Sequence, residues 1–245
     1  MSFGFTPGET VVVTGAGSGI GRAAAAMAAA MGCQVALWDR DADAVGSAAA
    51  ELVAGGARAS ATSVDVTVPG QVVAAVETAR ATHGPLRYLL NNAGPSSAVP
   101  MDFDAALVAA VGSVRLVTDV WAAAPDRPEG AAMVVTSSVA GNRVGTESDW
   151  YSAAKAALAG YVRHLAAHRS AEFRSNAVAP GMTDTPRLAT FRDSAQGAAS
   201  LSRIPLARMG TPAEVAAVLL FLVSPCSSYV NGAVLPVDGG WTVTQ

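Results

Sequence analysis

The sequence predicts an α/β fold in which a doubly wound parallel sheet of about seven strands carries helices on both faces. Two observations indicate this fold. Short runs of β-branched residues alternate with Ala-rich helical stretches along most of the chain. No linker rich in Pro, Gly or Ser divides the 245 residues, so we expect a single domain over 1–245. Strands that are each followed by a helix form βαβ units and hence a parallel sheet, and right-handed crossovers favour a doubly wound topology.

The first half of the chain supplies four strands and three helices in alternation. The expected strands are 10–15 (TVVVTG), 34–39 (QVALWD), 58–64 and 86–94, each a short apolar or β-branched run. The expected helices are 20–31, 42–53 and 71–82, which are rich in Ala and free of Pro. The strand at 86–94 ends in a turn. This order is that of repeated βαβ units.

The second half continues the alternation and contains one irregular segment. Helices are expected at 103–123, 150–168 and 212–223, and strands at 132–137, 174–179 and 233–237. Pro180 ends the strand at 174–179, because Pro has no N–H for a ladder. The stretch 185–211 lacks strong periodicity and carries several Arg, so we expect a substrate lid there.

Composition excludes several function classes. Charged residues make up 14% of the chain and the net charge is −3, which does not suit a nucleic-acid partner. The two cysteines show neither a disulfide framework nor metal-ligand spacing. The N-terminus does not resemble a secretory signal, and the longest apolar runs are shorter than a membrane span. We therefore expect a cytoplasmic protein without metal, membrane or nucleic-acid partners.

A glycine-rich turn follows the first expected strand and opens the first expected helix. The turn reads TGAGSGIG over 14–21. Glycines permit a tight turn and close backbone approach, and the free N–H groups of a helix N-terminus bind phosphate. The alternative is a connector without a ligand, but the strand–turn–helix context favours a dinucleotide site.

Asp39 ends the second expected strand, where a carboxylate accepts hydrogen bonds from an adenosine ribose. A negative charge at this position repels a 2′-phosphate and favours NAD over NADP. Arg40 follows directly and is a counter-signal, since a guanidinium pairs with a 2′-phosphate. The alternative for Asp39 is a simple cap on the following helix.

WYSAAK, over 150–155, places Tyr151 and Lys155 four residues apart on an expected helix. Residues at i and i+4 share one face of a helix, so the phenol and the ammonium lie on the same side. Taken alone, the pair is also compatible with an ordinary amphipathic helix.

Several motifs together resemble the short-chain dehydrogenase/reductase family in its NAD-preferring branch, over almost the whole chain from Thr10 to Gly240. In chain order they are TGAGSGIG (14–21), the pair Asp65 and Val66, NNAG (91–94), the serines 137–138, YSAAK (151–155), NAVAPGMTDTP (176–186) and VDGG (237–240). Ser138 precedes Tyr151 by thirteen residues, which is the family's usual interval.

The resemblance implies a Rossmann-type fold, an NAD cofactor and hydride transfer between nicotinamide and a secondary alcohol or ketone. It implies the catalytic residues Ser138, Tyr151 and Lys155, with Tyr151 as general acid/base. Lys155⁺ and the positive charge of the oxidised nicotinamide would together bring the pKa of the Tyr151 phenol toward working pH. The implied cofactor-binding residues are Gly15, Ser18, Gly19, Ile20, Gly21, Asp39, Asp65, Val66, Asn92, Ala93, Gly94, Tyr151, Lys155, Pro180, Met182, Thr183 and Thr185. It also implies a homo-oligomer, a tetramer or dimer, packed through the helices at 103–123 and 150–168.

The sequence departs from the family's pattern at two places. Family members usually carry an Asn in the long helix before the serine strand, and here that position falls on Ala110. Because Ala is the best helix former, we expect an unbroken α-helical ladder there and a slower proton relay behind Lys155. The stretch 166–176 lacks the family's Gly-containing turn, and we expect only the helix end to change.

Other readings of the function and of single residues stay open. One is an NADPH-dependent carbonyl or ketoacyl-thioester reductase, and another is a catalytically silent NAD-binding protein, which Ala110 favours. The arginines 187, 192, 203 and 208 would attract an anionic substrate or, more simply, belong to a solvated loop. Arg143, Glu147 and Asp149 fall where side chains can border the pocket. The three histidines, 83, 164 and 168, are expected on the surface or at helix ends.

Overall fold

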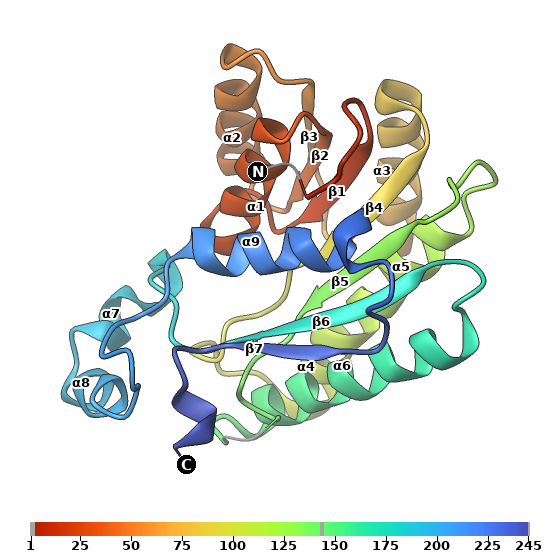
Figure 1. Ribbon diagram of the computed structural model, residues 1–245. Helices are drawn as coiled ribbons and strands as arrows, with labels where there is room; N and C mark the ends of the chain where they lie inside the picture. The colour runs from red at the N-terminus through yellow and green to blue at the C-terminus, as the bar shows by residue number, and fades with distance from the viewer. Residues whose placement is uncertain (1–2, 143–144, 245) are drawn as a thin grey trace.

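The computed structural model describes residues 3–142 and 145–244 and contains one seven-stranded sheet (Figure 1). The strands are β1 Thr10–Thr14, β2 Gln34–Asp39, β3 Ala59–Ser63, β4 Leu86–Asn91, β5 Ala132–Thr136, β6 Arg174–Pro180 and β7 Val234–Val237. All neighbouring strands are parallel, in the order β3-β2-β1-β4-β5-β6-β7. The predicted doubly wound α/β fold is therefore confirmed. Arg143 lies outside the described residues.

Helices cover both faces of the sheet. The longer ones are α1 Gly19–Ala30, α2 Ala42–Ala54, α3 Pro69–His83, α5 Ser113–Ala122, α6 Asp149–His168 and α9 Pro212–Val223. One buried cluster joins α1, α2 and α9 to the sheet, and a second joins α3, α5 and α6. Val11 and Val13 of β1 belong to the first cluster and Val12 belongs to the second. This alternation follows from the two-residue period of a strand.

The chain reverses its direction of travel across the sheet between β1 and β4. From β1 it moves outward to β3, then returns to place β4 beside β1 and moves on to β7 at the other edge. Ligands of open α/β sheets bind where such a reversal leaves a crevice at the carboxyl ends of the strands. The turn after β1 and the NNAG turn after β4 both lie at this crevice.

The segment between β6 and α9 is more regular than the sequence predicts. It contains a 3₁₀ turn, η2 Pro186–Leu188, and two short helices, α7 Ala189–Arg192 and α8 Ala195–Leu201. Such helices are too short to produce a visible period, and a local cap stabilises α8, where Ser194 Oγ accepts from Gly197 N at 3.0 Å. Figure 1 shows α7 and α8 lying apart from the sheet, beyond the start of α9.

One helical stretch, Phe103–Ala122, is long and apolar enough to cross a membrane by length and composition alone. In this fold α5, which forms its second half, packs against α3 and β4. Val114, Val117 and Trp121 are buried there in the second core cluster. The apolar character of this stretch is therefore explained by packing within the protein.

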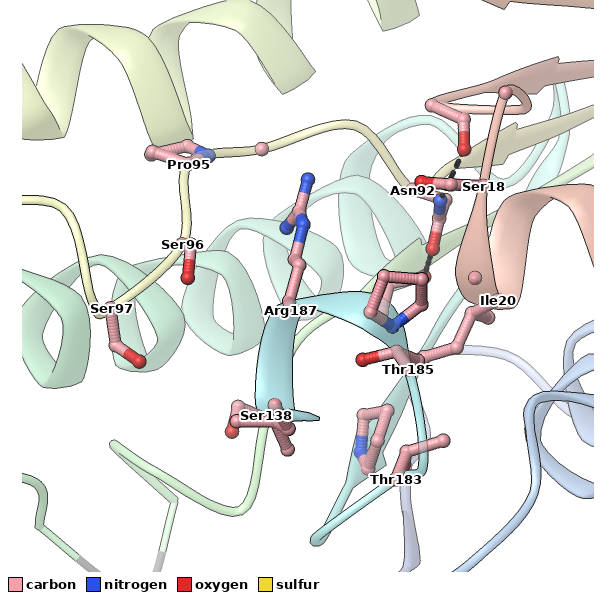
Figure 2. Close-up of a pocket in the computed structure, with 18 of the residues that line it drawn as sticks. Ser18, Ile20, Asn92, Pro95, Ser96, Ser97, Ser138, Thr183, Thr185 and Arg187 are labelled. Atoms are coloured by element: carbon pink, nitrogen blue, oxygen red, sulfur yellow. Dashed lines mark hydrogen bonds between the residues drawn. The ribbon is translucent and has the colours of Figure 1, made fainter. Parts of the chain in front are cut away.

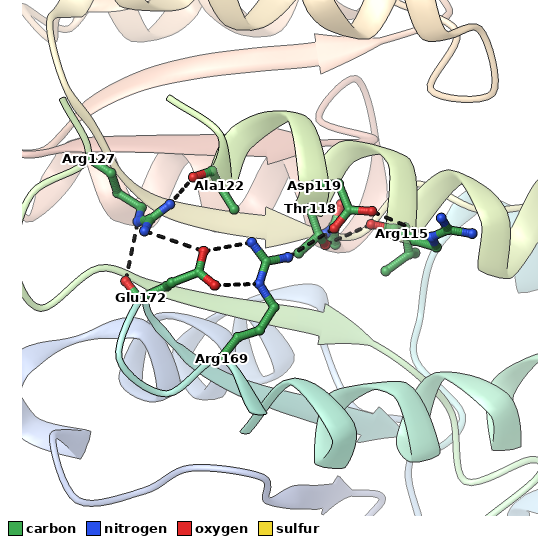
Figure 3. A network of polar contacts seen from close by, with 9 residues as sticks. Arg115, Thr118, Asp119, Ala122, Arg127, Arg169 and Glu172 are labelled. Atoms are coloured by element: carbon green, nitrogen blue, oxygen red, sulfur yellow. Dashed lines mark hydrogen bonds and ion pairs between the residues drawn. The ribbon is translucent and has the colours of Figure 1, made fainter. Parts of the chain in front are cut away.

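The end of α6 is held by a network of ion pairs (Figure 3). Arg169 pairs with Glu172 at 2.7 Å and with Asp119 of α5 at 2.9 Å. Arg127 also reaches Glu172, donating from Nε to its backbone oxygen at 3.2 Å. Arg169 caps the helix with φ −125°, so no left-handed glycine is required. The unusual stretch 166–176 thus ties α6 to α5, which is more than the local change at a helix end that we expected.

Candidate active site

A cleft of about 390 Å³ opens at the crevice beside the ends of β1 and β4 (Figure 2). Its lining comes from the turn after β1, the end of β2, the segment after β4, the end of β5, the start of α6 and the segment after β6. The predicted residues that line it are Gly15, Ser18, Gly19, Ile20, Asp39, Asn92, Gly94, Ser138, Tyr151, Lys155, Pro180, Thr183 and Thr185. Segments far apart in the sequence thus meet around one cavity.

The glycine turn has the geometry of an anion cradle. Gly15 and Gly19 adopt positive φ, +66° and +53°, which side-chain-bearing residues rarely adopt. A Cβ on Gly15 would lie 3.0 Å from Ala93 Cα, and one on Gly21 only 2.0 Å from Gly15 O. Within the described chain, the side chain of Ser18 makes no capping hydrogen bond to α1. The first amides of α1 therefore face the cleft without a side-chain cap, as a phosphate site requires.

Asp39 is fixed against this turn. Its carboxylate accepts from Gly17 N at 2.9 Å and from Asp41 N at 3.1 Å. The cap of α2 is Asp41, whose side chain accepts from Ala44 N at 3.0 Å. Asp41, and not Asp39, therefore caps α2, which excludes the alternative role considered for Asp39. Asp39 keeps its place at the cleft, beside Arg40, which also lines it.

Asn92 connects the glycine turn to β5. Its side-chain nitrogen donates to Thr14 O and Gly15 O, each at 3.2 Å. Its side-chain oxygen accepts from Thr136 Oγ1 at 3.0 Å. Because these bonds engage both ends of the amide, Asn92 positions the backbone around the cleft.

The phenol and ammonium of the YSAAK stretch share one face of α6, as predicted. Lys155 Nζ lies 5.5 Å from the centroid of the Tyr151 ring and donates to Thr136 O at 2.8 Å. Ser138 Oγ accepts from Ala140 N at 3.1 Å, and the Ser138 side chain is near enough to Tyr151 to lower its pKa. Ser148 Oγ caps α6 by accepting from Tyr151 N at 3.4 Å, which fixes the helix start at the cleft. Ser138, Tyr151 and Lys155 therefore meet beside the cradle.

Burial dominates the protonation of this group. It raises the pKa of Tyr151, while the hydrogen bond with Ser138 and the charge of Arg187 lower it in part. Burial, and then the charge of Arg187, lower the pKa of Lys155 to about 8. For the chain by itself, desolvation disfavours the phenolate more strongly than nearby charges favour it. The expected fall of the Tyr151 pKa, which combines the charges of Lys155 and of the oxidised nicotinamide, stays a prediction for the NAD-bound protein.

Five predicted residues of the described chain lie outside the lining of the cleft: Gly21, Asp65, Val66, Ala93 and Met182. Gly21 and Ala93 act behind the glycine turn, where they allow its close packing. Met182 is buried. The carboxylate of Asp65 accepts from Thr67 N at 2.9 Å and from Thr67 Oγ1 at 2.6 Å, and these bonds lower its pKa.

Three residues outside the predicted catalytic and cofactor-binding sets also act at the site. The backbone oxygen of Thr136 accepts the Lys155 ammonium. Asn142 donates from Nδ2 to Ser138 O and holds the serine loop. Arg187 lines the cleft and influences both Tyr151 and Lys155. Of the three, only Arg187 carried a sequence signal, and a solvated loop was the simpler explanation of its charge.

The histidines are divided between core and surface. His83 ends α3, as expected, but it is buried and hydrogen-bonds Ser60 Oγ at 2.7 Å and Gln34 Oε1 at 3.1 Å. Burial lowers its pKa. The expectation of a surface position is wrong for His83 and holds for His164 and His168, which are exposed on α6.

The helix around Ala110 is not an unbroken α-helix. It starts as α4 Phe103–Leu107, passes through a π-helical turn at Val108–Gly112 and continues as α5. Ser113 N donates to Val108 O, five residues back, and Ser113 Oγ donates to Ala109 O at 2.6 Å. In an α-helix Ser113 N would donate to Ala109 O, but in the wider π turn it donates to Val108 O. The Ser113 hydroxyl therefore supplies the hydrogen bond that Ala109 O would otherwise lack. The expected uninterrupted ladder is therefore wrong, because Ser113 stabilises the turn without an Asn at 110.

The substitution Ala110→Asn is expected to leave kcat and its pH profile unchanged within about twofold, since the π turn already exists. Steady-state rates from pH 6 to pH 10 check this. A faster variant, or one with a displaced pH profile, would show that the missing amide limits turnover.

The fold and the cleft define a class: an α/β dinucleotide-binding protein whose phosphate cradle faces a Tyr–Lys pair. Comparison with known proteins then gives the family. Residues 15–242 match a family model described as "Enoyl-(Acyl carrier protein) reductase". The chain is 37% identical over 249 residues to galactitol 2-dehydrogenase (L-tagatose-forming) of Cereibacter sphaeroides, covering 96% of each chain.

Solved structures agree. A short-chain dehydrogenase of Burkholderia cenocepacia J2315 in complex with NADP has a TM-score of 0.86 and 34% identity, covering 96% of this chain and 98% of that one. A 7α-hydroxysteroid dehydrogenase complexed with NADH and 7-oxo glycochenodeoxycholic acid has a TM-score of 0.91 and 29% identity, covering 100% and 97%. The chain belongs to the short-chain dehydrogenase/reductase family. It is an oxidoreductase that transfers hydride between a nicotinamide cofactor and an alcohol/ketone pair.

Proposed function

We propose that the protein is an NAD-dependent dehydrogenase/reductase for a secondary alcohol/ketone pair, with Ser138, Tyr151 and Lys155 as its catalytic residues. The observation that carries the proposal is their convergence beside the glycine cradle. Ser138 and Tyr151 line the same cleft, and Lys155 lies on the same helix face as Tyr151. A phenol, a hydroxyl and an ammonium at one end of a dinucleotide cleft are what proton transfer to a carbonyl oxygen requires.

Each residue has a distinct task in this proposal. The bound nicotinamide supplies the hydride acceptor or donor. Tyr151 takes the hydroxyl proton during oxidation and returns it during reduction. Ser138 holds the substrate oxygen by a hydrogen bond that strengthens as charge develops. Lys155, which in this structure donates to Thr136 O, binds the nicotinamide ribose and favours the phenolate electrostatically.

The residues around the glycine turn fit the rest of NAD. The open N-terminus of α1 suits the diphosphate, and the fixed carboxylate of Asp39 suits the adenosine hydroxyls. Pro180, Thr183 and Thr185 also line the cleft, where they would hold the carboxamide. Asp39 is the reason for preferring NAD to NADP, because its position is fixed by two backbone N–H groups.

We expect Asp39→Asn to reduce the preference for NAD over NADP by about tenfold or more, since a hydrogen bond to a charged group contributes roughly 1.5–3 kcal/mol. Asn keeps an oxygen for Gly17 N, so the turn is preserved while the charge is lost. The measurement is kcat/KM with each cofactor. Asp43→Asn is the matched control, because Asp43 carries a charge on α2 away from the cleft. An unchanged ratio in Asp39→Asn would remove the basis for the NAD assignment.

Two other functions have an observation in their favour. NADPH-dependent reduction, including that of ketoacyl thioesters, is favoured by Arg40, which lines the cleft beside Asp39. A silent NAD-binding role was favoured by Ala110 alone, and the π turn held by Ser113 removes most of that support.

The deciding experiment is a panel of secondary alcohols and ketones assayed with NAD(H) and NADP(H) in parallel. We expect turnover with NAD(H) to exceed turnover with NADP(H) for at least one substrate pair. Binding of NADH with no turnover of any compound would support the silent role. Turnover mainly with NADPH would support the reductase.

The remaining features of the proposal concern the chain as a whole. Residues 1–245 form a single domain in which 185–211 acts as the substrate lid. The contact from Gln196 Nε2 to Glu147 Oε1, at 2.7 Å, joins α8 to the segment before α6 and supports a closed lid. The proposed protein is cytoplasmic and assembles as a homotetramer or dimer through the surfaces around α5 and α6. Size-exclusion chromatography with light scattering measures its oligomeric state.

A further inference from the structure

Arg187 stands at the reaction end of the cleft. It belongs to the 3₁₀ turn Pro186–Leu188, directly after Thr185. Thr185 lies against the glycine turn, since a Cβ on Gly19 would meet Thr185 Cγ2 at 3.3 Å. Figure 2 shows the Arg187 side chain extending between the Pro95–Ser96 segment and the Ser18–Asn92 side of the cleft. Its position is therefore set by a segment that packs directly on the proposed cofactor site.

The charge of Arg187 has no acidic partner in the part of the chain that the structure describes. This distinguishes it from two other arginines of the lid region. Arg192 pairs with Asp184 at 3.1 Å and with Asp193 at 2.9 Å. Arg208 pairs with Glu214 at 2.6 Å. A solvated-loop explanation accounts for those two, whereas Arg187 directs an uncompensated cation into a cavity.

The reaction end of the cleft is positively charged as a result. The Arg187 charge acts on both Tyr151 and Lys155, lowering the pKa of each. The acids of the cleft itself, Asp39 and Asp41, lie at the opposite, adenosine end. Two cations beside a neutral phenol attract an anion in this region, where partial burial strengthens the attraction relative to bulk water.

Acidic side chains near the mouth do not neutralise this end. Glu147 and Asp149 line a separate shallow depression with Trp150 and Met101. Glu147 is held by Gln196 of α8, and Asp149 accepts from Trp150 N at 2.6 Å at the start of α6. Neither residue lines the cleft, and the carboxylate of each already accepts a hydrogen bond, so an anionic ligand is the available partner for Arg187.

We propose that Arg187 binds an anionic group of the substrate, so that the preferred substrates are hydroxy acids and keto acids rather than uncharged alcohols and ketones. The proposal rests on the proposed dehydrogenase function and specifies its substrate class. A guanidinium pairs with a carboxylate through two parallel hydrogen bonds, which also orients the substrate. The cofactor diphosphate shares this oxyanion chemistry. It already has the N-terminus of α1 as its site, and the experiment separates the two sources.

The first experiment measures kcat/KM for hydroxy acids and their methyl esters, such as 3-hydroxybutyrate and 4-hydroxycyclohexanecarboxylate, within the substrate panel. We expect the wild-type protein to prefer the acid over its ester by roughly 10- to 100-fold, since a charge-assisted hydrogen bond is about twice as strong as a neutral one. Arg187→Gln should lose this preference through a higher KM for the acid. Arg192→Gln is the matched control and should keep it, because Arg192 is already paired.

The second experiment does not depend on turnover. Cyclohexanecarboxylate and cyclohexanecarboxamide, which cannot be oxidised at a hydroxyl, are titrated into the protein–NADH complex and followed by NADH fluorescence. The carboxylate should bind about tenfold or more tightly than the amide, and Arg187→Gln should abolish the difference. NADH alone should bind wild type and Arg187→Gln with the same dissociation constant.

The possible outcomes distinguish an Arg187 that binds the anionic group of the substrate from an Arg187 that binds the cofactor diphosphate. Equal binding of carboxylate and amide to wild type overturns the anion site. A loss of NADH affinity in Arg187→Gln, with the acid preference intact, assigns Arg187 to the cofactor diphosphate and also overturns the proposal. If no alcohol in the panel is oxidised but carboxylate binding still depends on Arg187, the dehydrogenase assignment fails while the anion site stands.

Discussion

Replacing Tyr151 by Phe is expected to lower kcat by about 10²- to 10⁴-fold, the range that one general acid/base contributes. The phenol oxygen is the atom removed, and it is the proposed proton carrier. The ring remains, so its edge contact with Trp150, with centroids 5.6 Å apart, is kept. The substitution therefore removes the proton carrier with little change in packing. NADH binding, measured by fluorescence titration, should change less than about threefold, because the ring adds no charge to the site.

Tyr161→Phe is the matched control for this experiment. Tyr161 lies on the same helix and is half-buried, with a pKa raised to about 12 by burial, and it sits away from the cleft. Removing the Tyr161 hydroxyl should leave kcat unchanged. If Tyr151→Phe keeps more than about a tenth of the wild-type kcat, Tyr151 is not the general acid/base.

The fold was predictable because its signals are local. The strand β2 begins and ends where the apolar run QVALWD does, and α9 begins at Pro212, directly after the capping residue Thr211. Thr211 and Glu214 form a reciprocal capping box, which is readable in the sequence as a Thr followed three residues later by a Glu. The parallel order of the strands then follows from the alternation of strand and helix.

The finer features of the site depend on contacts that the sequence does not encode locally. The π turn at Ala110 is stabilised by the Ser113 hydroxyl, whereas helix propensity at 110 points to an ordinary ladder. The raised pKa of Tyr151 depends on how deeply the assembled cleft buries it. Whether an arginine of the lid is paired depends on which carboxylates the fold places beside it, and this separates Arg187 from Arg192.

Lys155 carries a cost in stability that follows from its burial. The side chain is only 9% exposed, and its ammonium has one hydrogen-bond acceptor among the described contacts, Thr136 O at 2.8 Å. Burial and the Arg187 charge lower its pKa from 10.5 to about 8. Between those two values the unfolded chain binds more protons than the folded one, so the contribution of Lys155 to stability rises with pH. The cost is absent above pH 10.5, grows as the pH falls, and is complete below about pH 8.

Lys155→Met is therefore expected to raise the free energy of unfolding of the cofactor-free protein at pH 7 by about 1–3 kcal/mol while abolishing most of its activity. A buried cation is replaced by an apolar chain of similar length, and the loss of one donor to Thr136 O offsets part of the gain. Urea unfolding at pH 7 and pH 9.5 measures the effect. The gain should shrink at the higher pH, where the wild-type amine is largely neutral.

Lys155 is the only lysine among the 245 residues, so its titration can be observed without assignment. Protein labelled with ¹³C-lysine should give one side-chain signal that titrates near pH 8 without cofactor. Arg163→Gln, which removes an exposed cation from the same helix, is the control and should leave stability within about 0.5 kcal/mol of wild type. A Lys155→Met protein less stable than wild type at pH 7, with a lysine signal titrating above pH 10, would show that the folded chain stabilises this ammonium. In the expected case the folded chain keeps a poorly solvated cation at this site, with Thr136 O as its one acceptor among the described contacts.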